Sequence, residues 1–167
     1  MVVAAALGQI GKTTGYDGSY VRLAYPGGDV PLDRGVCSDV LIRAFRKAGL
    51  DLQVLVHEDM KKAFRSYPKL WGSSRPDRNI DHRRVANLMT FLRRQGKALS
   101  ISKEASYYFP GDIVAWRLPS GLLHIGLVAD TKSSASGRYL IVHNIGAGAQ
   151  PEDILFSYEI IGHYRYF

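Results

Sequence analysis

The sequence predicts an α+β domain in which N-terminal helices pack on a C-terminal antiparallel β-sheet. Apolar residues recur at helical spacing in the first part of the chain, whereas after Tyr107 they form short strand-length segments separated by turns. Helices followed by a run of strands are typical of the α+β class. The chain has 167 residues, of which 46% are hydrophobic and 22% charged, so we expect one globular domain over residues 1–167.

Four segments in the first part of the chain have helical character. Their residue ranges are 2–10, 37–48, 56–67 and 82–94. In the second of them, Val40, Ala44 and Ala48 recur on one face, and Gly49 follows as a stop signal. Residues 13–34 and 68–79 are rich in turn-forming residues. We predict them to be long loops, which often carry functional residues.

The rest of the chain has the pattern of an antiparallel sheet. The sequence Leu118-Pro119-Ser120-Gly121 lies between two strand-like runs and is typical of a hairpin turn. The expected strands are residues 112–117, 122–129, 138–144, 154–158 and 163–167.

Positive charge is concentrated in one part of the chain. The net charge is +7, and residues 41–103 hold 15 of the 22 Lys and Arg but only 5 of the 15 Asp and Glu. Such a segment suits an acidic partner, which could be nucleic acid, an anionic membrane surface or the bacterial cell wall, or it is a solvated helical surface without a partner. No stretch approaches 18 consecutive apolar residues, so no membrane-spanning helix is predicted.

The single cysteine, Cys37, is the first candidate functional residue. One cysteine excludes an internal disulfide and a Cys-rich zinc site. Cys37 stands at the start of the first strong helix, where the partial positive charge of the helix end stabilises a thiolate and lowers its pKa. The thiolate is a nucleophile, although a free cysteine is also often just a small buried apolar residue.

Two histidines are candidates for the base that a cysteine nucleophile needs. His124 lies among apolar residues in the predicted strand 122–129, and His143 ends the following strand, just before Asn144. Successive antiparallel strands can place the two imidazoles side by side. A nucleophile at a helix start followed by histidines on strands is the order found in papain-like enzymes.

Four motifs in this order resemble those of NlpC-type and CHAP-type papain-like cysteine amidases. They are Tyr25-Pro26-Gly27-Gly28 with Cys37-Ser38-Asp39-Val40, Gly111-Asp112-Ile113-Val114-Ala115-Trp116, His124-Ile125-Gly126-Leu127-Val128, and Ile141-Val142-His143. The resemblance spans the chain and is closest to a domain-of-unknown-function family of exported bacterial proteins within that superfamily. The separation of 74 positions between Cys37 and Gly111 is longer than we expect for peptidoglycan enzymes, because the basic region lies between them.

The resemblance implies a papain-like fold and a role for each matching residue. Cys37 would attack a carbonyl carbon, with its backbone N–H in the oxyanion hole, and His124 would be the general base. The sequence leaves open whether His143 or Asn144 orients His124. It also leaves open which loop tyrosine covers the site: the two candidates are Tyr16 and Tyr25.

The basic region adds candidate substrate-binding residues. Arg83 and Arg84 can bind carboxylates bidentately, and we expect them, with Asp39, to contact substrate. Asp81 is expected to cap the helix that follows it.

The function that we predict is hydrolysis of an amide bond in the peptide of bacterial peptidoglycan or another anionic peptide. The chemistry needs no cofactor or metal, and no nucleic acid partner is expected. The site of action would be the periplasm or the exterior, with an export signal removed before the first residue. If the protein is an antibacterial toxin, it would have an immunity partner. The alternatives are a basic, non-catalytic binding module for an anionic polymer and a thiol acyltransferase on the same fold.

Overall fold

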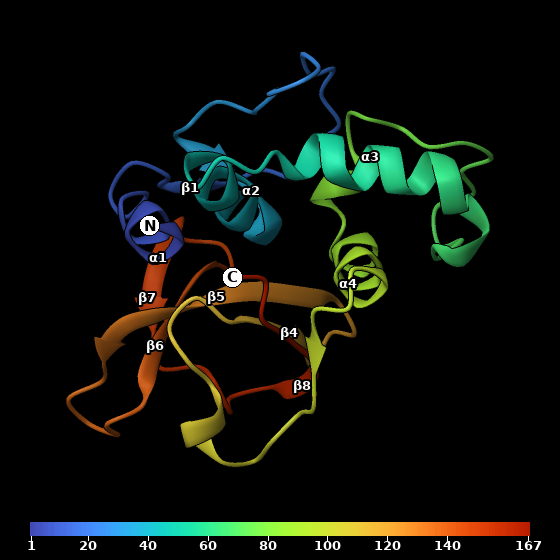
Figure 1. Ribbon diagram of the computed structural model, residues 1–167. Helices are drawn as coiled ribbons and strands as arrows, with labels where there is room; N and C mark the ends of the chain where they lie inside the picture. The colour runs from blue at the N-terminus through green and yellow to red at the C-terminus, as the bar shows by residue number, and fades with distance from the viewer.

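Four α-helices lie on one side of a six-stranded antiparallel sheet (Figure 1). The computed structural model describes all 167 residues. The helices are α1 (Val2–Leu7), α2 (Cys37–Lys47), α3 (Leu52–Ala63) and α4 (Val85–Arg94). None of them is both long enough and apolar enough to cross a membrane. The predicted α+β architecture, with N-terminal helices on an antiparallel sheet, is confirmed.

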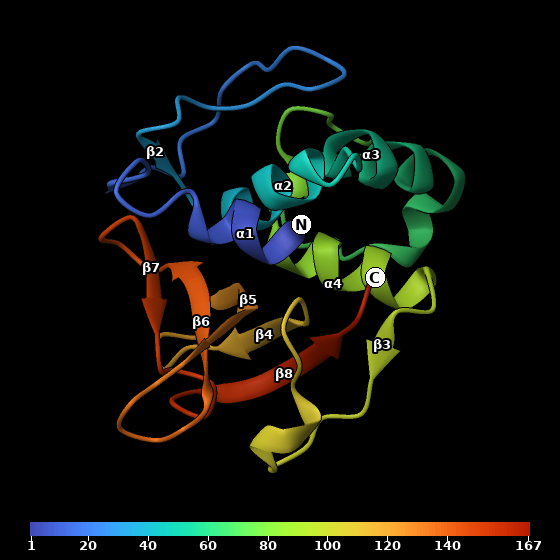
Figure 2. The ribbon, with the colours of Figure 1, turned by 60° about the vertical axis from the view of Figure 1, so that its left-hand side comes forward.

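The sheet has a simple neighbour order, β3-β8-β4-β5-β6-β7, which can be followed across Figure 2. Its strands are β3 (Ala98–Leu99), β4 (Ile113–Arg117), β5 (Leu123–Lys132), β6 (Tyr139–Asn144), β7 (Ala149–Glu152) and β8 (Glu159–Tyr164). A separate two-stranded parallel ribbon joins β1 (Gly15–Tyr16) to β2 (Arg34–Gly35), directly before α2. The predicted hairpin turn connects β4 to β5 in register.

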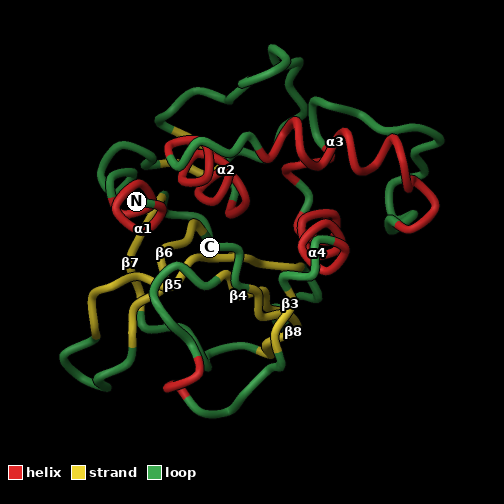
Figure 3. The backbone as a smooth tube through the Cα atoms, viewed as in Figure 1, coloured by secondary structure: helices red, strands yellow, loops and turns green.

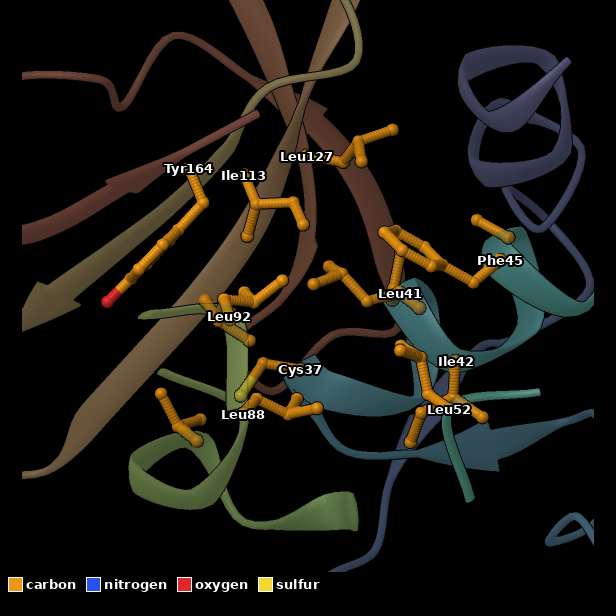
Figure 4. Packing of buried hydrophobic residues seen from close by; sticks show 14 of the residues in the cluster. Cys37, Leu41, Ile42, Phe45, Leu52, Leu88, Leu92, Ile113, Leu127 and Tyr164 are labelled. Atoms are coloured by element: carbon orange, nitrogen blue, oxygen red, sulfur yellow. The ribbon is translucent and has the colours of Figure 1, made fainter. Parts of the chain in front are cut away.

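The main hydrophobic core lies between the helices and the sheet. Figure 4 shows Leu41 and Phe45 of α2 and Leu92 of α4 packed toward Ile113 and Leu127 of the sheet. All five side chains are almost completely buried. Side chains of this size each contribute roughly 1.5–3 kcal/mol when they are withdrawn from water, so this layer fixes α2 and its first residue, Cys37, against the sheet.

The opposite face of the sheet is covered as well. Trp116 lies there in a second apolar cluster with Val128 and Ile141. Leu155, from the loop between β7 and β8, also belongs to this cluster, and its carbonyl accepts a hydrogen bond from Trp116 Nε1 at 3.0 Å. Because both faces are buried, the central strands are apolar on both sides.

Several predicted boundaries are corrected. Residues 154–158 form a turn, not a strand, while the strand missed by the sequence analysis is β7; β8 begins at Glu159 instead of residue 163. Helix α3 begins earlier than predicted because Asp51 caps it, accepting the Gln53 N–H at 3.0 Å.

The predicted helix 82–94 is also divided. A short 3₁₀ turn, Asp81–Arg83, precedes α4, and Arg84 is the residue at the helix boundary. Asp81 therefore does not cap α4. Its carboxylate accepts the backbone N–H of Asp77 at 2.5 Å instead.

Two long loops lie on the side of the helices away from the sheet (Figure 3). Hydrogen bonds join them: Tyr20 Oη donates to Asp77 Oδ2 at 2.8 Å, and the Leu23 N–H donates to Asn79 Oδ1 at 2.9 Å. The predicted loop character of residues 13–34 and 68–79 is confirmed apart from the short strands β1 and β2.

Candidate active site

Cys37 is the first residue of α2, and its thiol is buried where this helix meets β5. Its relative exposure is 4%, and Figure 4 shows its sulfur at the helix start among core side chains. Cys37 and Ile125, the residue after His124, belong to the same core cluster, and the Ile125 backbone N–H lowers the pKa of the thiol. The structure therefore brings the candidate nucleophile to the strand that carries the candidate base.

Burial dominates the acidity of Cys37. It raises the pKa of the thiol to about 11, and hydrogen bonds from the N–H groups of Ile125, Ser38 and Cys37 itself oppose it only in part. The expectation that the helix start lowers this pKa is corrected: withdrawal from water destabilises the thiolate more than the helix end stabilises it. The resting side chain is a neutral thiol.

His124 and His143 lie side by side, and both are buried. His124 Nε2 is 2.9 Å from His143 Nδ1, and His143 Nε2 is 2.7 Å from Glu152 Oε2. Trp116, directly opposite His124 in the β4–β5 pair, has its ring centroid 5.8 Å from that imidazole. A relay of three side chains thus leads from the buried His124 to the half-exposed Glu152.

These contacts determine which nitrogen of His124 is free. His143 Nε2 is 2.7 Å from the Glu152 carboxylate, although the pair does not have the angles of a regular hydrogen bond. Because a carboxylate can only accept, this contact favours the tautomer with the proton on His143 Nε2. His143 Nδ1 then carries no proton and accepts one from His124 Nε2. The lone pair of His124 is left on Nδ1, which is the atom able to take a proton from a thiol.

Both imidazoles are neutral at neutral pH. Burial, followed by the charge of His143, lowers the pKa of His124 to about 3. Burial also lowers the pKa of His143, although Glu152 acts in the opposite direction. The His124 ring hydrogen-bonds to His143 and not to the Cys37 thiol in this structure. No contact joins the Cys37 thiol to the His124 imidazole: Trp116, the cross-strand neighbour of His124, belongs to the second apolar cluster, whereas Cys37 belongs to the main core. Because both groups are neutral, catalysis by this pair would require the proton to move during nucleophilic attack, which is general-base catalysis.

Asn144, the alternative to His143, has a different position. Its amide Nδ2 donates to the carbonyls of Gly15 and Gly35 at 3.1 and 3.2 Å, and its Oδ1 accepts the N–H groups of Gly146 and Gly148 at 3.1 and 3.2 Å. The side chain is therefore fully engaged in tying the end of β6 to the β1–β2 ribbon before Cys37. His143 is the residue that contacts His124.

The two candidate tyrosines are also separated by the structure. Tyr16 is half exposed, and its pKa is raised by burial and then by the nearby Cys37 and Asp39 side chains. Tyr25 instead donates to Glu58 Oε1 at 3.2 Å and packs edge-on against His57, 5.4 Å between ring centroids. Of the two tyrosines, only Tyr16 has its pKa affected by Cys37.

Arg83 and Asp39 form a buried ion pair. Arg83 Nε and Nη2 donate to Asp39 Oδ1 and Oδ2 at 3.0 and 2.9 Å, with side-chain exposures of 2% and 3%. Asp39 Oδ2 also accepts the Val36 N–H at 2.7 Å, and the Arg83 carbonyl accepts Ser38 Oγ at 2.6 Å. The expectation that Arg83 and Asp39 bind substrate is corrected, because the two side chains form an ion pair with each other. They position the first turn of α2.

Arg84 has a more accessible position. Its Nη1 is 3.2 Å from Asp81 Oδ1, and its guanidinium carbon lies 4.2 Å from the centre of the Trp71 ring. Both side chains line a hollow of about 360 Å³ together with Tyr20 and Val36, the residue before Cys37. Arg84 therefore remains a candidate for contact with a substrate next to the nucleophile.

Glu152 and Trp71 were missed by the sequence analysis. The alternation of β7 was hidden by Pro151 and by the short length of the strand, so no signal placed an acid beside His143. Trp71 lies in the turn-rich segment. Only its large ring, which is apolar but carries one N–H donor, distinguishes it there from its neighbours in the sequence.

Comparison with known proteins identifies the family of the chain. A family model described as a domain of unknown function, DUF1287, matches residues 3–166. The chain is also 59% identical over 159 residues to the Escherichia coli (strain K12) protein named "Uncharacterized protein YijF", and the match covers 95% of this chain and 77% of that protein. The chain belongs to the DUF1287 family.

Proposed function

We propose that the protein is a papain-like cysteine amidase or peptidase that hydrolyses an amide bond in bacterial cell-wall peptide. One observation carries the proposal: the His124–His143–Glu152 relay leaves a lone pair on His124 Nδ1, and the Cys37 thiol meets the same strand at the next residue. A nucleophile, a base and an orienting group are the parts that such catalysis requires. The motifs that resemble NlpC-type and CHAP-type amidases contain Cys37, His124 and His143.

The reaction would proceed in two halves. His124 Nδ1 takes the proton of the Cys37 thiol while the sulfur attacks the amide carbonyl carbon. The imidazolium then gives this proton to the departing amine, the C–N bond breaks, and the acyl group stays on sulfur as a thioester. Water, deprotonated by the same imidazole, hydrolyses the thioester to a carboxylic acid and restores the thiol.

The start of α2 offers stabilisation for the oxyanion of the intermediate. The N–H groups of Cys37 and Ser38 belong to the first helical turn, where no intrahelical acceptor exists, and both act as donors toward the sulfur. Donors fixed in this way stabilise negative charge without reorganisation. The Arg83–Asp39 pair holds this turn in place.

The substrate class rests on charge and on the resemblance. Residues 41–103 carry an excess of positive charge, and peptidoglycan stem peptides carry several carboxylates. An enzyme acting on them works in the periplasm or outside the cell, and if it is used against rival bacteria it has an immunity partner.

Digestion of purified peptidoglycan tests this proposal. The chain and its Cys37→Ala variant are incubated with the polymer, and soluble products are identified by mass spectrometry. We expect new amine and carboxyl ends at one type of amide bond with the unmodified chain and none with Cys37→Ala. Equal products from both chains, or none from either, would sink the proposal. Binding without products would favour a non-catalytic module.

A further inference from the structure

A second, larger hollow lies between the two long loops. It has a volume of about 830 Å³, and arginine side chains are prominent in its lining: Arg22 from one loop, and Arg75 and Arg78 from the other. The Tyr20–Asp77 and Leu23–Asn79 hydrogen bonds close the loops against each other. The walls of this arginine hollow are therefore fixed by contacts between segments far apart in the sequence.

The three arginines have no ionic partners. Nine of the 14 arginines in the chain form ion pairs with carboxylates, and three of the remaining five line this one hollow. The one carboxylate in the lining, Asp77, already accepts hydrogen bonds from Tyr20 Oη and from the N–H and side-chain amide of Asn79. An excess of free guanidinium groups in a polar hollow fits an anionic ligand.

The arginine hollow adjoins the candidate active site. Tyr20 lines both it and the smaller hollow that contains Val36, Trp71 and Arg84. Val36 directly precedes Cys37, so the smaller hollow lies next to the start of α2, and through Tyr20 it borders the arginine hollow.

We propose that the arginine hollow binds carboxylates of the peptide substrate and selects for peptides that carry more than one. The inference rests on the proposed function and adds a specificity-determining subsite to it. Guanidinium groups bind carboxylates through paired, charge-assisted hydrogen bonds. The backbone and hydroxyl groups of Ser73 and Ser74 in the same lining provide further donors.

Equilibrium binding tests the inference without any turnover. Calorimetry measures the binding of a peptidoglycan-derived stem peptide, and of the same peptide with its carboxylates amidated, to the chain carrying Cys37→Ala. Adding Arg22→Gln and Arg75→Gln should raise the Kd of the acidic peptide about tenfold or more, because each substitution removes charge-assisted hydrogen bonds to a carboxylate. The Kd of the amidated peptide should change less than about twofold, because it has lost the groups that the arginines bind.

The matched control is Arg65→Gln with Arg93→Gln. These two arginines also form no ion pair and lie outside the hollow, so the variant removes the same charge elsewhere. It should leave both Kd values unchanged. The inference would be overturned if the control variant weakened peptide binding as much as the test variant, or if the test variant did not weaken it. It would also be overturned if no peptide bound at all, or if inorganic phosphate at equal concentration displaced the acidic peptide. Failure of the proposed function is seen separately, as absent cleavage by the unmodified chain.

Discussion

His124→Ala should lower kcat by about 100- to 10,000-fold, the usual contribution of a general base, while the protein stays folded. His124 Nδ1 is the atom that takes the thiol proton in the proposed reaction, because His124 Nε2 is engaged by His143. The measurement is turnover of peptidoglycan peptide, normalised to the folded fraction from thermal melting.

His143 variants provide the matched comparison. His143 orients the imidazole and does not itself move the proton, so His143→Ala should keep residual activity. His143→Asn should keep more, because a side-chain amide can accept the His124 Nε2 proton. If His124→Ala melts normally and keeps more than a few per cent of the activity, the assignment of the base is wrong.

The same proposal sets the pH dependence of the reaction. The thiol has a pKa of about 11 and the His124 imidazole one of about 3, both as a result of burial. The reactive neutral forms therefore persist between these values, and kcat/KM should be flat across the neutral range. A bell-shaped dependence of kcat/KM on pH, with its maximum between pH 6 and 8, would indicate a thiolate–imidazolium pair instead.

Arg83→Met should destabilise the protein by about 3–5 kcal/mol, as expected when one member of a buried ion pair is removed. The variant leaves the Asp39 carboxylate at the start of α2 with a negative charge and no partner. Unfolding in urea, followed by circular dichroism, measures the change in the free energy of unfolding.

Arg84→Met is the control for this change. Arg84 is more exposed, with a side-chain exposure of 20%, and its partner Asp81 keeps the Asp77 N–H as a donor, so the loss of stability should be smaller than for Arg83→Met. Equal destabilisation of the two variants would contradict the positioning role of the Arg83–Asp39 pair. If Arg83→Met instead has unchanged stability and a raised KM, Arg83 binds substrate.

Most of the fold could be predicted from the sequence because the residues with helical or strand spacing are also the residues that become buried in the folded protein. Helical spacing begins at Cys37, and the same face of α2 is the one that packs on the sheet. The neighbouring placement of His124 and His143 could be predicted from successive strands. Which face each residue occupies could not, since both faces of β6 are buried and Leu140-Ile141-Val142 shows no alternation.

The errors have physical causes of the same kind. Residues 154–158 looked like a strand because Leu155 is apolar, but this residue covers Trp116 from a turn. Arg83 was assigned to substrate binding because its partner, Asp39, is 44 positions away in the sequence. The pKa of Cys37 was misjudged because the helix start is visible in the sequence and the depth of burial is not.

A double-substitution cycle tests most directly whether Cys37 and His124 act as one catalytic unit. Turnover is measured for the unmodified chain, Cys37→Ala, His124→Ala and the double variant, each with its folded fraction. If thiol and imidazole perform one proton-coupled step, the double variant should be no slower than the slower single variant. Losses that multiply would mean that the two residues act independently, and this would contradict the account.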